Sequence, residues 1–170
     1  NYFKNGNTLP ISKRKKLLKN LKKEILSNEN KIFQVLKDDL RKSNYETYLT
    51  EIGILISEID LFLNNLNKWA KPKKVKSSLL SFPSSDYIYS EPYGKILVIS
   101  PWNYPLIQPS ILVVPALLAG NGVVLKPSEF TPLTALKMKE VYDDAGVPEG
   151  IFQVVIGAGD VGKTLVESQE

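Results

Sequence analysis

The stretch "GVVLKPSEFTPLTALKMKEVYDDAG", residues 122–146, predicts one strand followed by one helix. Its opening "GVVLK" is a short apolar run, which is typical of a buried strand. Thr131 is placed to cap the helix, Pro132 suits its first position, and Gly146 supplies a stop. A buried strand that leads directly into a helix is the repeating unit of an α/β fold.

The same unit is predicted on both sides of this stretch. Before it, a strand at residues 95–100 leads into a buried helix at 106–119, where Pro115 is expected to cause a kink. After it, a strand within residues 150–156 leads into a helix that begins at about residue 159. Continuous apolar strands that alternate with helices predict a parallel sheet covered on both faces, with right-handed crossovers.

The N-terminal part of the chain is predicted to be helical. Apolar residues recur at helical spacing over residues 12–27, 28–43 and about 45–69, and Ser12 is a candidate N-cap. The following "KPKKVKSS" is interpreted as a connector, and residues 87–89 as an extended arm. We therefore expect an α/β fold in which a helical segment, residues 1–76, precedes a βαβαβα Rossmann-like segment, residues 86–170.

Composition excludes several classes of site. The 170 residues contain no cysteine and no histidine, which removes disulfides, zinc fingers and Ser–His–Asp triads, and we expect no metal site. No uninterrupted apolar stretch has the length of a membrane span. The chain fits one domain or part of a larger protein, and a cytoplasmic setting is the default expectation.

Charge is distributed unevenly along the chain. Residues 1–76 hold 17 Lys and Arg against 8 Asp and Glu, whereas residues 77–170 hold 5 against 10. The basic helix at residues 13–23 would suit a nucleic acid or an anionic membrane, but also an ordinary solvated helix face. No aromatic side chains are interleaved for base stacking, and the apolar face of the helix is needed for the core, so we expect no nucleic-acid partner and no membrane partner for this segment.

Special residues follow each predicted strand of the parallel sheet. The three strands end in "SPWN", "KPSE" and "GAGDVG". In open α/β sheets, ligands bind outside the carboxyl ends of the strands, so these loops are the candidate site. The alternative is that loops between strands and helices are polar in any case.

Each loop also has a functional and a structural interpretation. Asn103 offers an amide that can stabilise an oxyanion, or that can satisfy its own turn. Lys126 and Glu129 can hold a ribose, or form a surface ion pair. "GAGDVG" fits a phosphate-binding G-x-G-x-x-G, or a tight turn that needs glycine, and it follows the third strand rather than the first.

Four stretches together resemble the N-terminal part of the aldehyde dehydrogenase superfamily. Three of them are "EPYGKILVISPWNYPL", "PALLAGNGVVLKPSEFTPLTA" and "GVPEGIFQVVIGAGDVGKTLV", in this order. The fourth, "YLTEIGILISEIDLFLNNLNKWAKPKKV", is similar to the class 3 branch, which acts on fatty and aromatic aldehydes. The resemblance covers nearly the whole chain.

This resemblance implies NAD(P)-dependent oxidation of an aldehyde to a carboxylate through a cysteine thioester. Asn103 would be the oxyanion donor, and Lys126 and Glu129 would hold the adenosine ribose. Pro101 and Trp102 would line the cofactor cleft, and the helix start at Gly159 and Gly162 would lie along the adenosine. Glu129 favours NAD over NADP by its charge, and the choice stays open.

The resemblance also implies that parts of the enzyme are missing. In the family, the nucleophilic cysteine and the general-base glutamate lie downstream of this region, and this chain has no cysteine. We therefore expect an N-terminal fragment, inactive alone, whose full-length form is a homodimer. The alternatives are a non-catalytic nucleotide-binding or scaffolding module and, within the superfamily, an acylating or acyl-phosphate reductase.

Overall fold

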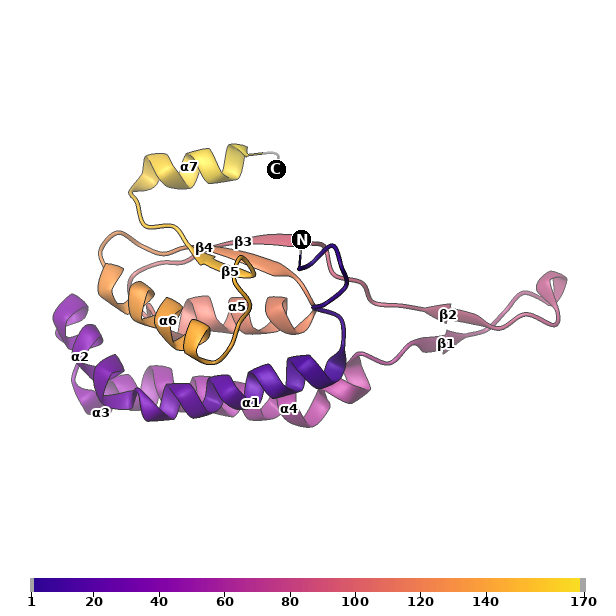
Figure 1. The fold of residues 1–170 in the computed structure, drawn as a ribbon, viewed down its shortest axis with the longest axis horizontal. Coiled ribbons are helices and arrows are strands. Elements are labelled where there is room, and N and C mark those ends of the chain that lie inside the picture. The colour runs from indigo at the N-terminus through magenta and orange to yellow at the C-terminus, as the bar shows by residue number, and fades with distance from the viewer. Residues whose placement is uncertain (1, 169–170) are drawn as a thin grey trace.

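A computed structural model describes residues 2–168, and it divides the fold into stacked layers. A helical layer lies at one side, the parallel sheet lies beyond α5 and α6, and α7 lies over the far face of that sheet (Figure 1). A thin two-stranded arm projects from the body. The expected α/β architecture of N-terminal helices followed by a Rossmann-like unit is confirmed.

The N-terminal layer consists of four helical pieces and one irregular turn. They are α1 (Ile11–Ser27), α2 (Glu29–Leu40), α3 (Asn44–Thr47), the π-helical turn η1 (Tyr48–Ile52) and α4 (Gly53–Trp69). In η1 the N–H of Gly53 donates to the carbonyl of Tyr48, five residues back, so the predicted third helix is interrupted by one wide turn. Helix α1 begins at Ile11 with Pro10 before it, so the prediction of Ser12 as N-cap is wrong.

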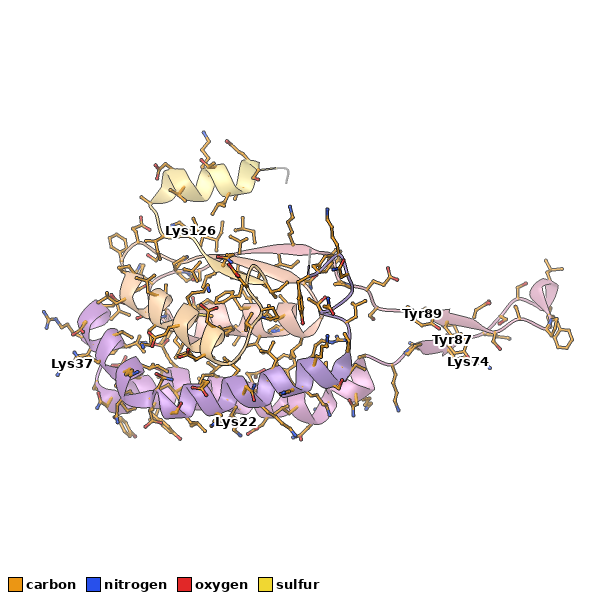
Figure 2. The ribbon with its side chains drawn as sticks, viewed as in Figure 1. Lys22, Lys37, Lys74, Tyr87, Tyr89 and Lys126 are labelled. Carbon is orange, nitrogen blue, oxygen red and sulfur yellow. The ribbon has the colours of Figure 1, made fainter. Side chains whose placement is uncertain are left out.

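The stretch "KPKKVKSS", which was predicted to be a connector, contributes one strand of the arm. Residues Lys73–Val75 form β1, which pairs antiparallel with β2 (Asp86–Ile88), and the short helix η2 (Leu79–Ser81) lies between them. Figure 2 shows Lys74, Tyr87 and Tyr89 along this arm. The lysine-rich stretch therefore becomes a strand because an extended partner lies opposite it, which local composition did not reveal.

The parallel sheet has the order β3–β4–β5 and alternates with helices. Its elements are β3 (Lys95–Ile99), α5 (Ile107–Leu118), β4 (Gly122–Lys126), α6 (Pro132–Asp144), β5 (Phe152–Val154) and α7 (Gly159–Glu167). Register pairs Ile99 with Lys126 and Val124 with Gln153. Each predicted strand and helix of this half is present, with the third strand shorter than predicted.

One face of this sheet is buried and the other is largely open. Helices α5 and α6 pack between the sheet and the N-terminal helices, where Val98, Leu125 and Phe152 are almost fully buried. On the far face only α7 lies nearby, and Leu97 and Ile99 stay 37% and 50% exposed. The expectation of cover on both faces is thus met only in part within residues 2–168. None of the helices in this range is both long and apolar enough to cross a membrane.

Candidate functional site

The three loops that follow β3, β4 and β5 meet at one edge of the sheet. Figure 1 shows all three at the end of the sheet away from the arm. The N–H of Ser100 donates to the carbonyl of Lys126 at 3.1 Å, and the N–H of Val155 donates to the carbonyl of Leu125 at 2.9 Å. These bonds carry the parallel pairing up to the loops, so the first and second loops start side by side.

The first loop presents Asn103 to solvent. Pro101, Trp102 and Asn103 are all exposed, with Trp102 at 53%, whereas Pro105 is buried. Within residues 2–168 the side-chain amide of Asn103 makes no hydrogen bond, so both of its N–H groups are available to a ligand. An uncommitted amide in a loop bounded by Pro101 and Pro105 is suited to binding a developing negative charge.

The start of α5, directly after this loop, is held by an acid that the sequence did not single out. Glu51 is fully buried, and its Oε2 accepts from the N–H of Leu106 at 2.7 Å and of Ile107 at 3.2 Å. Lys42 donates from Nζ to the other oxygen, Oε1, at 2.5 Å. No local sequence motif predicts this contact, because Glu51 and Leu106 lie 55 residues apart.

The second loop contains the Lys126–Glu129 pair. Lys126 Nζ lies 3.5 Å from Glu129 Oε2, with the lysine side chain 7% exposed and the carboxylate side chain 43% exposed. The backbone N–H of Glu129 donates to its own carboxylate, which lowers its pKa below the ordinary value, and the charge of Lys126 lowers it further. The loop therefore offers a buried ammonium beside an ionised, accessible carboxylate.

The helix that follows this second loop is capped differently from the prediction. Thr131 makes no side-chain cap, and its Oγ1 is buried without a hydrogen-bond partner among the described residues. Instead, Asp39 of α2 accepts from the N–H of Thr134 at 2.8 Å and from its hydroxyl at 2.7 Å. Thr131 therefore occupies the N-cap position as predicted, but its hydroxyl makes no cap hydrogen bond, and a carboxylate from α2 accepts from the first turn of the helix instead.

The third loop brings α7 close to Lys126. A Cβ added to Gly162 would lie 3.7 Å from Lys126 Cε, and Figure 2 shows Lys126 between the sheet and α7. Space around Gly159 is open, with nothing within 4 Å of an added Cβ. At Gly157 an added Cβ would lie 2.4 Å from Val161 Cγ2, so glycine is needed there for steric reasons. Gly157 is thus needed for steric reasons, whereas Gly159 and Gly162 leave the start of α7 accessible.

Other possible sites lie elsewhere or are not found. A cavity of about 310 Å³ lies near the ends of α5 and α6, lined in part by Arg14, Leu117 and Ala145, at the opposite edge of the sheet. It contains none of the loop residues described above. Across residues 2–168, no three His, Cys, Asp or Glu side chains come together as they would around a metal ion.

The comparisons agree with the class that this fold defines, a Rossmann-like α/β unit with loops converging at one edge. The aldehyde dehydrogenase family model matches residues 1–170. Aldehyde dehydrogenase family 3 member B1 of Bos taurus is 39% identical over 165 residues, covering 97% of this chain and 35% of that protein. The chain therefore belongs to the aldehyde dehydrogenase family, and its similarity to the class 3 branch is confirmed.

Solved structures show the same fold. A Staphylococcus aureus AldH in a substrate-bound state has a TM-score of 0.89 and 38% identity, covering 97% of this chain and 36% of that one. An NAD+ complex of an aldehyde dehydrogenase from Bacillus cereus has a TM-score of 0.85 and 26% identity, covering 94% and 32%. The chain spans about a third of the length of these relatives.

Proposed function

We propose that these residues are the N-terminal part of the NAD(P)-binding domain of an aldehyde dehydrogenase, which oxidises an aldehyde to a carboxylate. One observation carries this proposal: the free amide of Asn103 and the Lys126–Glu129 pair share one sheet edge. Membership of the family and the NAD+-bound relative support it.

The Lys126–Glu129 pair fits a nucleotide ribose. Lys126 Nζ is buried and forms an ion pair with the Glu129 carboxylate at 3.5 Å. An ammonium donor beside a carboxylate acceptor matches two vicinal hydroxyls, each of which can donate and accept. The carboxylate also disfavours a 2′-phosphate, so we expect NAD to be preferred to NADP.

The glycines of the third loop fit the same group. Open space at Gly159 and the short side chain of Gly162 beside Lys126 leave the start of α7 accessible to the adenosine. Pro101 and Trp102, both exposed, would form the neighbouring wall of the cleft. NAD(P)+, when bound, supplies the hydride acceptor.

Asn103 is the proposed catalytic group of this chain. Its amide donates hydrogen bonds to the aldehyde oxygen as negative charge develops on that atom. The nucleophilic cysteine and the general-base glutamate would come from a segment that the relatives have and these 170 residues lack. We therefore expect the 170-residue chain alone to be inactive, and a full-length homodimer to be the active form. The cytoplasmic location expected from composition stays a prediction.

The experiment that tests this proposal uses the full-length protein that contains this segment. Aldehyde-dependent reduction of NAD(P)+ is followed by absorbance, and Asn103→Ala should lower kcat by about 10²–10³. The control is Asn67→Ala, since Asn67 is exposed on α4 and far from the loops in the fold. An unchanged kcat in Asn103→Ala would contradict the oxyanion role.

A second outcome separates the enzyme from the alternative module. If the full-length protein binds NAD(P)+ but reduces none of it with fatty, aromatic or short-chain aldehydes, a nucleotide-binding or scaffolding role is favoured. Production of NADH by the isolated 170-residue chain would contradict its expected inactivity, because the chain holds no thiol to attack the aldehyde.

A further inference from the structure

The Lys42–Glu51 ion pair is buried directly behind the Asn103 loop. The two side chains are 8% and 0% exposed, and Lys42 Nζ lies 2.5 Å from Glu51 Oε1. Burying two charges costs free energy that the pair alone does not reliably repay, so such a pair is weak evidence of stabilisation. This pair is distinguished by its further contacts, because the second carboxylate oxygen of Glu51 and the ammonium of Lys42 both reach residues near Asn103.

Both members of the pair contact the loop that carries Asn103. Glu51 Oε2 accepts from the N–H of Leu106 at 2.7 Å, three residues after Asn103. Lys42 Nζ lies 4.2 Å from the ring centroid of Tyr104, the next residue after Asn103, within range of a cation–π interaction. The loop is also fixed before Asn103, where the N–H of Ser100 donates to Lys126.

We infer that Lys42 and Glu51 are positioning residues for the Asn103 amide. They fix the backbone at Tyr104 and Leu106, so that the exposed amide between these points and Ser100 has a defined direction. A donor to a developing charge must be held to within about 0.5 Å by groups that are themselves fixed. This inference rests on the oxyanion role proposed for Asn103.

A second ion pair in the same helical layer provides a matched control. Lys22 donates to both oxygens of Asp60, at 2.6 and 2.7 Å, and joins α1 to α4. The two side chains are 30% and 45% exposed, and in the part of the chain that the structure describes neither forms a hydrogen bond with the Asn103 loop. The two pairs have the same chemistry and differ in whether they reach the residues around Asn103.

The test neutralises each pair in the full-length enzyme. Lys42→Met with Glu51→Gln keeps a buried amide acceptor and leaves no unpaired charge, and Lys22→Met with Asp60→Asn is the control. We expect the first double variant to lower kcat by about 10²-fold, the cost of displacing a catalytic group by about 1 Å, and the control to leave kcat unchanged.

The decisive comparison repeats the substitution in the Asn103→Ala background. If the pair acts through Asn103, neutralising it there lowers kcat no further. An equal loss in both backgrounds, or no loss in the wild-type background, would overturn the inference. Tyr104→Leu is the second variant should the neutralised pair fail to fold, since Tyr104 is 36% exposed, and it should show the same non-additivity.

Hydrogen exchange keeps this inference separate from the proposed function. The amides of Leu106 and Ile107 should exchange faster when the Lys42–Glu51 pair is neutralised and unchanged when the Lys22–Asp60 pair is neutralised. If Asn103→Ala leaves kcat unchanged while these amides still respond, the oxyanion role fails and the pair is shown to hold the loop for another purpose. If the amides do not respond, the inference itself is wrong.

Discussion

The starts of α5 and α7 differ in how they are held, although both follow strands of the same sheet. Helix α5 begins on the buried carboxylate of Glu51, and seven of its residues are buried. Helix α7 has no buried residue and no side-chain cap. Its first turn can pack against the preceding loop only because Gly157 has no side chain to meet Val161. The edge therefore combines one loop fixed by the core with one loop defined by backbone shape alone.

The largest effect expected from this difference follows removal of Glu51. Glu51→Ala leaves the charge of Lys42 buried without its partner and the N–H groups of Leu106 and Ile107 at the start of α5 unpaired. It should therefore lower the free energy of unfolding by about 3–5 kcal/mol. Urea denaturation of the full-length protein measures this. Asp60→Ala is the control, and a loss there as large as in Glu51→Ala would contradict the contrast between buried and exposed pairs.

A smaller effect is expected at the α7 loop. Gly157→Ala brings a Cβ to 2.4 Å from Val161 Cγ2, so it should lower the free energy of unfolding by about 1–3 kcal/mol and raise the KM for NAD(P)+. Thermal unfolding and cofactor titration measure the two effects. Gly159→Ala has open space and should affect stability less; equal losses in both variants would show that Val161 is not the cause.

The start of α6 is intermediate between those of α5 and α7. It is held by a carboxylate from another helix, as α5 is, but this carboxylate, Asp39, is only half-buried. Asp39→Ala removes hydrogen bonds to the N–H and the hydroxyl of Thr134, and should lower the free energy of unfolding by about 1–2 kcal/mol. Chemical denaturation measures this effect. Rescue by Asp39→Asn, which keeps an acceptor, would support a cap; no rescue would indicate that charge is the main contribution.

The smallest expected effect concerns pH. Because the folded pKa of Glu129 is lowered from 4.5, the unfolded chain takes up its proton first as the pH falls. Its contribution to stability is therefore present above pH 4.5 and is lost as the pH falls through the lower folded pKa. Glu129→Gln should flatten the acid side of the stability profile slightly, and an unchanged acid slope would contradict this assignment.

The regular elements of the parallel half could be predicted from local sequence. Strands β3 and β4 are continuous apolar runs, and Pro132 and Gly146 mark the ends of α6, so period and punctuation were sufficient. Strand β1 could not be predicted, because its lysines form a strand only against β2. The open face of the sheet was not predicted either. Apolar strands indicate that a sheet face is buried, but not whether the segment that covers it lies within these residues.

The candidate site shows the same division. Asn103, Lys126 and Glu129 could be proposed because residue type and position after a strand are local properties. Glu51 and Asp39 could not, because a carboxylate on one helix and the N–H groups that it accepts from lie 55 and 95 residues apart. Their geometric roles depend on contacts between distant parts of the chain, which only the fold brings together.

The number of residues in the π-helical turn η1 affects the buried Lys42–Glu51 pair, although part of the turn is exposed. Glu51 lies inside η1, while Leu49 in the same turn is 51% exposed. The N–H of Gly53 reaches five residues back rather than the four of an α-helix, so deleting one residue here would convert the wide turn into an α-helical one. Because Glu51 lies inside this turn, its direction relative to Lys42 would change. Natural variants of this segment should therefore tolerate substitutions at Leu49 far more readily than a single-residue insertion or deletion.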